Sequence, residues 1–232
     1  MPRTALIFGA GNGISASFAR LLAQRDYRVA LVARNADKLS ALAKEISGIA
    51  ISADSTIASQ VAAAFDETET KLGPLDCVLY NASQRVRGPI QDLDPAAVAQ
   101  AINVTAFGGF LTAREAARRM LPRGSGTIMF TGASASVKGY PQSATFAMGK
   151  FALRGLAQSM ARELHPHGIH VAHFVIDGGV RNESRGRVEG RDDTPDSLLD
   201  PDAIAGTYLH ILEQPRSAWS WEIEMRPWTE RF

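Results

Sequence analysis

The stretch Leu6-Ile7-Phe8-Gly9-Ala10-Gly11-Asn12-Gly13-Ile14-Ser15 decides the fold. The apolar residues before the glycines predict a buried strand over residues 4–8, and the apolar periodicity after them predicts a helix over residues 14–25. Glycines between a strand and a helix permit a sharp turn and a close approach of the backbone to a ligand. The helix N-terminus adds free N–H groups and the positive end of its dipole. The turn therefore predicts a binding site for the pyrophosphate of a dinucleotide.

The same alternation of strand and helix continues along the chain. Apolar runs predict further strands over residues 28–33, 48–52, 75–80, 127–131 and 170–176, and such nearly continuous runs are typical of strands buried on both faces. Helical periodicity predicts helices between them over residues 36–46, 57–72, 95–120 and 144–164. A last helix over residues 202–213 and a strand over 219–225 complete the pattern. This order is typical of an α/β fold, a single doubly wound Rossmann-type domain over residues 1–232 with a parallel sheet flanked by helices.

The composition limits the partners that the chain can have. Of its 232 residues, 45% are hydrophobic and 21% are charged, and the net charge is +1 with no block of like charges. This balance argues against nucleic acid or an anionic membrane surface as the main partner. The sequence holds no apolar run near the roughly 20 residues that a membrane span requires. Residues 1–3 leave no room for a signal peptide before the first strand, so we expect a cytoplasmic protein.

The end of the second predicted strand indicates which dinucleotide binds. NAD-binding folds usually carry an acid there, about 20 residues after the glycine turn, and this acid holds the ribose 2′-hydroxyl. Here the sequence is Ala33-Arg34-Asn35. An acid would repel a 2′-phosphate, whereas the Arg34 guanidinium would pair with it. The sequence therefore predicts NADP(H) rather than NAD(H) as the cofactor.

Motifs in order along nearly the whole chain resemble the short-chain dehydrogenase/reductase family. Residues 9–15 resemble its TGxxxGIG turn, Asn81-Ala82-Ser83 its NAG segment, Asn103-Val104-Thr105 its helix asparagine, and residues 126–130 and 168–171 two of its strands. The resemblance implies that the helices over 95–120 and 144–164, which carry small and apolar residues, pair copies into a homodimer or homotetramer. It also implies cofactor contacts from Gly9, Gly11, Asn12, Gly13, Ile14, Arg34, Asp54, Ser55, Asn81, Ala82, Lys150, Gly178, Val180 and Asn182.

The chain departs from this family at its catalytic positions. Lys150 is present, but Phe146 stands four residues before it, where the family has tyrosine, and Ala133 stands where the family has serine. Asp177-Gly178 replaces the family's Pro-Gly. A phenyl ring cannot donate a proton, and losing a positioned general acid costs about 10²–10⁴ in rate. The candidate catalytic residues are Lys150, Asn103, Ser134, Asp177 and Phe146.

Three hypotheses for the function remain open. The first is an NADP(H)-dependent oxidoreductase with an altered proton relay, in which Asp177 or Ser134 supplies the proton or the substrate is an activated C=C, imine or carbonyl. The second is an ordinary family member in which Tyr140 replaces the missing acid. The third is a catalytically silent module that binds NADP(H) as a redox sensor or for a partner protein. The sequence does not identify the small-molecule substrate.

Two further segments have alternative interpretations. Residues 181–201 form a long polar loop, which is either a lid for an anionic substrate, through Arg181, Arg185, Arg187 and Arg191, or a solvated loop balanced by its own acids. The histidines of residues 165–173 straddle a helix end, a turn and a strand, so their imidazoles need not converge. We therefore predict no metal site.

Overall fold

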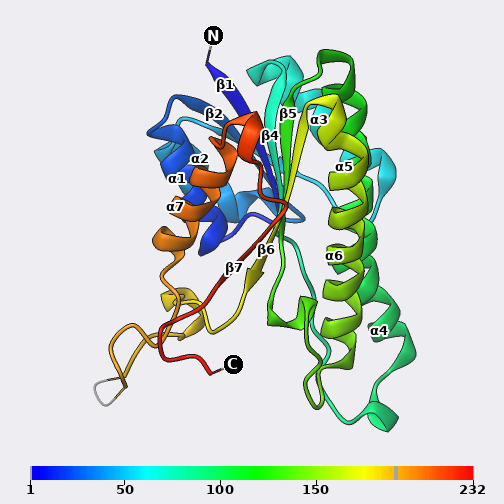
Figure 1. Cartoon of the computed structure of the whole chain (residues 1–232), viewed down its shortest axis with the longest axis vertical. Helices are drawn as coiled ribbons and strands as arrows, with labels where there is room; N and C mark the ends of the chain where they lie inside the picture. The colour runs from blue at the N-terminus through cyan, green and yellow to red at the C-terminus, as the bar shows by residue number, and fades with distance from the viewer. Residues whose placement is uncertain (1, 191–192, 232) are drawn as a thin grey trace.

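A single parallel sheet organises the molecule (Figure 1). The computed structural model describes residues 2–190 and 193–231. The sheet has seven strands in the order β3-β2-β1-β4-β5-β6-β7, so the order reverses between β1 and β4. The doubly wound α/β fold is thereby confirmed. The strands are β1 (Arg3–Phe8), β2 (Tyr27–Ala33), β3 (Ile49–Ser52), β4 (Leu75–Tyr80), β5 (Gly126–Thr131), β6 (Ile169–Ile176) and β7 (Glu222–Met225).

Helices cover both faces of this sheet (Figure 1). One face carries α1 (Ile14–Ala23), α2 (Ser40–Glu45) and α7 (Pro201–Leu212), and the other carries α3 (Ala58–Leu72), α5 (Gly108–Met120) and α6 (Ala144–Leu164). The last four residues of β1 are apolar because the strand is buried on both faces. Leu6 and Phe8 belong to the core on the α3–α5–α6 face, while Ala5 and Ile7 belong to the core on the opposite face.

The helix predicted over residues 95–120 is interrupted. The structure has α4 (Pro95–Ile102), a π-helical turn over Asn103–Phe107, and then α5. Asp94 begins α4 because its carboxylate accepts hydrogen bonds from the N–H groups of Ala96 and Ala97. The wide turn exposes the carbonyl of Val104, which accepts a hydrogen bond from the Tyr80 hydroxyl. The interruption thus ties α5 to the end of β4.

By length and composition alone, the helix running over Pro95–Arg123 could cross a membrane, although the sequence suggested no such span. In the structure its second half is part of the core. Ala113, Ala116 and Met120 are each no more than 1% exposed, and they pack on the sheet beside α3 and α6. A core helix of a Rossmann-type domain can be as long and as apolar as a membrane span, and this helix is placed as such a core helix.

Small residues let α5 come close to the sheet. A Cβ placed on Gly108 would lie 2.4 Å from the Tyr80 hydroxyl oxygen, and one on Gly109 would lie 2.5 Å from Leu153 Cδ1. These two glycines therefore pack inside the molecule.

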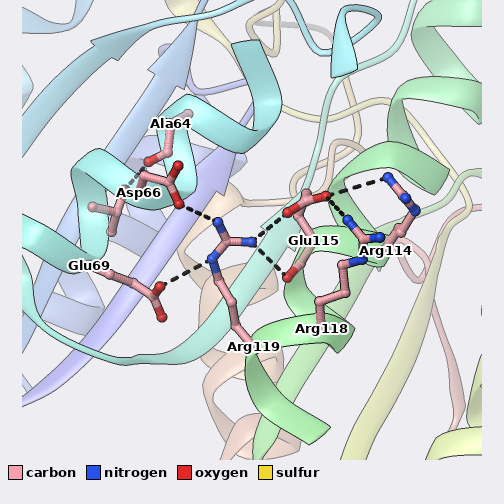
Figure 2. Close-up of polar contacts among 8 residues, drawn as sticks. Ala64, Asp66, Glu69, Arg114, Glu115, Arg118 and Arg119 are labelled. Carbon is pink, nitrogen blue, oxygen red and sulfur yellow. Dashed lines mark hydrogen bonds and ion pairs between the residues drawn. The ribbon is translucent and has the colours of Figure 1, made fainter. Parts of the chain in front are cut away.

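An ion-pair cluster joins α3 to α5 (Figure 2). The Arg119 guanidinium contacts Asp66 and Glu115 at 2.5 Å each, and Glu69 at 3.1 Å. Arg119 and Glu115 have side chains only 17% and 10% exposed, so water screens this contact less than it screens a surface pair. The cluster fixes how α3 and α5 lie on the sheet.

The C-terminal third differs most from the sequence analysis. Strand β7 begins at Glu222 rather than at residue 219, and Trp219 before it stacks on His170 with ring centroids 4.7 Å apart. The predicted loop over residues 181–201 contains a short 3₁₀ turn, Glu183–Arg185. Arg181 in this loop pairs with Asp200, just before α7. Arg191, another arginine of the predicted lid, lies outside the described residues.

Candidate active site

A cleft opens at the carboxyl ends of the strands, beside the point where the strand order reverses. Doubly wound folds bind their ligands at this place. The cleft has a volume of about 550 Å³ and adjoins a smaller cavity around the glycine turn. Predicted cofactor residues that line the cleft are Gly9, Ile14, Arg34, Asp54, Ser55, Asn81, Ala82, Lys150, Gly178 and Val180. Gly11, Asn12, Gly13 and Asn182 line the smaller cavity, so the structure brings the whole predicted set together.

The glycine turn is held by the end of β4. Gly9 has a φ of +73°, and a Cβ there would lie 2.4 Å from the backbone nitrogen of Ala82. The Asn81 amide nitrogen donates to the Gly9 carbonyl at 3.3 Å and to Ser15 Oγ at 2.7 Å. Asn81 and Ala82 therefore shape the turn.

The rest of the turn fits the pyrophosphate of a dinucleotide. Gly13 begins α1 without a side-chain cap among the described residues, and the first turn of α1 carries no acid. A Cβ on Gly11 would meet nothing within 4 Å in the part of the chain that the structure describes. The Asn182 side chain donates to the Asn12 carbonyl and so brings the loop after β6 to the turn. The N-terminus of α1 is thus open to an anion.

Replacing Gly9 by alanine is expected to lower the free energy of unfolding by at least about 2 kcal/mol, because strain at positive φ adds to the overlap with Ala82. Denaturant unfolding measures this loss. Gly11→Ala is the matched control, since a Cβ there has open space. It should unfold like the wild type but bind dinucleotide more weakly. Equal stability of the two variants would contradict this account of the turn.

Positive charge dominates the cleft wall. Arg34, Arg85, Arg185 and Arg187 line it with Lys150, and Asp54 is the only acid among the described lining residues. The pKa of Asp54 is lowered, mainly because its carboxylate accepts a hydrogen bond from the backbone N–H of Thr56. Arg34, which is exposed, adds to this effect through its charge. Arg34, Arg185 and Arg187 of this wall suit a ligand that carries several phosphates.

Lys150 and Phe146 meet at the inner end of the cleft. Lys150 Nζ is buried and donates to the Thr131 carbonyl at 2.6 Å. Burial, with a smaller effect of the Arg85 charge, lowers the pKa of Lys150 to about 7. The Phe146 ring lies 5.8 Å from Lys150 Nζ and carries no polar atom. Ala133 also lines the cleft. Neither position therefore offers a hydroxyl group to a substrate.

The other predicted catalytic residues do not line this cleft within the described parts of the chain. The Asp177 carboxylate is buried and turned toward Lys138 Nζ at 3.1 Å and Arg226 at 3.5 Å. Ser134 begins a 3₁₀ turn, and its carbonyl accepts from the N–H groups of Val137 and Lys138. Asn103 opens the π-helical turn and is exposed, while its neighbour Val104 lines the cleft. The predicted proton-donating roles of Asp177 and Ser134 thus find no support in this geometry.

Tyr140 does not replace the missing tyrosine. Tyr140 is 44% exposed, and Lys138 Nζ lies 6.0 Å from the centroid of its ring. It does not line the cleft in the described structure. The second hypothesis, an ordinary member that uses Tyr140, is therefore not favoured.

A buried polar chain that the sequence analysis missed lies behind the cleft. Ser136 Oγ accepts from the Ala133 N–H at 3.1 Å and contacts His173 Nε2 at 3.3 Å. His173 Nδ1 lies 3.1 Å from Glu222, which forms a double hydrogen bond with Arg154. Only the register between β6 and β7, which sets Glu222 beside His173, reveals this contact. These polar contacts hold the loop around Ala133 against the sheet.

Acid is expected to destabilise the protein through His173. Burial lowers the pKa of His173 to about 4 from its ordinary value of 6.5, so the unfolded chain takes up this proton first as the pH falls. The free energy of unfolding therefore decreases between pH 6.5 and 4, by about 3 kcal/mol from this residue. His173→Gln should remove that part of the decrease, as measured by urea unfolding at several pH values. His167→Gln, at an exposed position, is the control. A wild-type pH profile in His173→Gln would refute the argument.

The remaining histidines of residues 165–173 make other contacts. His165 Nε2 accepts from the N–H of Val171 at 3.1 Å, and His170 Nε2 contacts the Ser220 carbonyl at 2.9 Å. Among the described residues there is no group of three or more His, Cys, Asp or Glu that could hold a metal ion.

Comparison with known proteins identifies the family. The family model described as short chain dehydrogenase matches residues 3–189. This chain belongs to the short-chain dehydrogenase/reductase family. The 3-oxoacyl-[acyl-carrier-protein] reductase of Rattus norvegicus is 32% identical over 190 residues, which cover 79% of this chain and 78% of that protein. Its relatives are thus oxidoreductases.

Solved structures of this short-chain dehydrogenase/reductase family agree with the fold. A short-chain dehydrogenase from Rhodopseudomonas palustris is 36% identical, covers 97% of this chain and 99% of its own, and has a TM-score of 0.84. A metagenomic short-chain oxidoreductase in complex with NADP is 26% identical, covers 97% of each chain, and has a TM-score of 0.82. The glycine turn, the open α1 N-terminus and the basic cleft fit such a cofactor.

Proposed function

We propose that this chain is an NADP(H)-dependent oxidoreductase of the short-chain dehydrogenase/reductase type with an altered proton relay. Its substrate would be a small molecule with an activated C=C, imine or carbonyl group. The observation that carries the proposal is the combination of a complete dinucleotide cleft with apolar side chains at positions 146 and 133. When bound, the cofactor supplies the hydride of the reduction.

The preference for NADP(H) over NAD(H) rests on charge. Arg34 lines the cleft at the end of β2, and the neighbouring residues Ala33 and Asn35 carry no acid. A guanidinium favours the 2′-phosphate through charge-assisted hydrogen bonds. The metagenomic relative bound to NADP supports the same preference.

The altered relay limits the chemistry. Lys150 would hold the inner end of the cofactor through its buried ammonium or amine group. No hydroxyl at position 146 or 133 can protonate a developing alkoxide, and a positioned general acid contributes about 10²–10⁴ in rate. A substrate that spreads the developing charge, such as a conjugated alkene or an imine, needs this help less. For this reason we propose substrates with an activated C=C, imine or carbonyl group rather than simple ketones.

The experiment is incubation of the protein with NADPH and a panel of ketones, enones and imines, with cofactor oxidation followed by absorbance. We expect oxidation with activated substrates and little with simple ketones. A second candidate, a catalytically silent NADP(H)-binding sensor or partner-binding module, is favoured by the same loss of both hydroxyl groups. NADPH binding without oxidation by any member of the panel would support the silent module instead.

We also propose a homodimer or homotetramer in the cytoplasm, joined through α5 and α6. These helices and the turn before α5 expose Phe107, Phe110, Met148 and Phe151, which are between 43% and 54% exposed. Phe107 and Phe110 stack with centroids 5.9 Å apart.

Light scattering should give at least twice the chain mass of 24.9 kDa. Replacing Phe110 and Phe151 by aspartate should reduce it to one chain, whereas Ile90→Asp, at a 77% exposed position after β4, should not. A monomeric wild type would exclude the assembly.

A further inference from the structure

Arg85 is an exposed residue on the loop that follows β4, and it lines the cleft beside Phe146. Its guanidinium carbon is 3.8 Å from the centroid of the Phe146 ring. The same ring has Lys150 Nζ at 5.8 Å. The loop is anchored next to Arg85, because the Gln84 N–H donates to Thr105 Oγ1 at 3.1 Å. The structure thus holds a forked hydrogen-bond donor against the residue that replaces the catalytic tyrosine.

The charge of Arg85 is not balanced by the protein. Within residues 2–190 and 193–231 no carboxylate forms an ion pair with it, although Arg119 and Arg154 are both paired. Partial burial, and then the nearby charges of Arg87 and Arg187, lower the pKa of Arg85. A guanidinium surrounded in this way by other arginines attracts an anionic ligand.

The phosphates of the cofactor have other partners. Arg185 and Arg187 line the smaller cavity around the glycine turn as well as the cleft, so they face the place of the pyrophosphate. Arg34 lies at the end of β2, where the 2′-phosphate is expected. Arg85 lines the cleft but not the cavity around the turn, and it contacts Phe146 instead. Its anion therefore belongs to a second molecule.

We propose that Arg85, stacked on Phe146, binds a carboxylate group of the substrate, so that the substrate is a small organic anion. A guanidinium presents two parallel N–H groups that match the two oxygens of a carboxylate. Stacking on the ring holds the fork in one plane and so reduces the freedom lost on binding. This assignment rests on the proposed function, because it takes the rest of the cleft to be filled by NADP(H).

The test is calorimetric titration of the NADP⁺-saturated protein with benzoate and trans-cinnamate, each compared with its neutral amide. Hydrogen bonds to a charged group predict that the carboxylates bind about tenfold or more tightly than the amides. Arg85→Gln should abolish that difference and leave NADP⁺ affinity within about twofold. Arg87→Gln removes an equal charge from an exposed residue outside the described cleft wall and should keep the difference. Dissociation constants are measured throughout, so no turnover is needed.

Each contrary outcome has a distinct meaning. Equal affinity of acids and amides, or no carboxylate binding at all, would overturn the assignment of Arg85. If Arg87→Gln also abolished the difference in affinity between acids and amides, the assignment would be overturned. The positive charge of the whole region, rather than the guanidinium stacked on Phe146, would then bind the carboxylate. Failure of the wild type to bind NADP⁺ would refute the proposed function instead. Titration of carboxylates into the cofactor-free protein would in that case still decide whether Arg85 binds them.

Discussion

Phe146→Tyr combined with Ala133→Ser is expected to raise the rate of ketone reduction by about 10²–10⁴. Position 146 lies four residues before Lys150 on α6, so the new hydroxyl shares a helix face with the lysine. A hydroxyl at position 133 would add a second hydrogen-bond donor for the developing oxyanion. Neither substitution should change the affinity for the cofactor. The gain is measured as kcat/KM for ketones with NADPH.

Single variants separate the two contributions. Phe146→Tyr alone should give most of the gain, because it restores the proton donor, and Ala133→Ser alone should give little. The triple variant with Lys150→Met is the control, since it removes the ammonium that assists the tyrosine. If the double variant binds NADPH normally and still reduces no ketone, then the missing hydroxyl groups do not explain the altered relay.

The sequence predicted the parts of this site that depend on local chemistry. The glycine turn follows from three glycines between a strand and a helix, and both its conformation and its open face are local properties. The family resemblance placed Asn81 and Ala82 after the fourth strand, and the structure has them in the cleft at the carboxyl edge of the sheet. The family resemblance then supplied the positions of Phe146 and Lys150, which share one helix face.

The parts that were missed depend on distant packing. Arg85 lies on an irregular loop, and nothing in the residues around it predicts that its guanidinium rests on a ring 61 positions away. Asp177 was placed correctly at the end of β6, but the direction of its carboxylate is set by Lys138 and Arg226. The His173–Glu222 contact likewise depends on the register of β6 and β7. Side-chain direction at strand ends is a tertiary property, so a single sequence does not determine it.

Arg34→Asp is expected to weaken NADP⁺ binding by about 10²-fold while leaving NAD⁺ affinity equal or higher. Charge-assisted hydrogen bonds to the 2′-phosphate account for about tenfold or more, and repulsion from the new carboxylate adds to this loss. NAD⁺ carries a 2′-hydroxyl instead, which an aspartate can hold as a hydrogen-bond acceptor. Fluorescence titration with both cofactors measures the change. Arg34→Gln adds no carboxylate, so it should lose only the charge-assisted hydrogen bonds and weaken NADP⁺ binding less than Arg34→Asp does.

Lys44→Asp gives the matched control for this change. It alters the net charge by the same amount on the neighbouring helix α2, and Lys44 is exposed and outside the described cleft wall. Because exposed charges beyond about 10 Å are largely screened at 0.1 M salt, Lys44→Asp should change NADP⁺ affinity far less than Arg34→Asp. An equal loss in both variants would mean that overall charge, not the Arg34 guanidinium, attracts the cofactor. Tighter binding of NAD⁺ by the wild type would refute the predicted preference directly, since the basic wall would then serve the pyrophosphate alone.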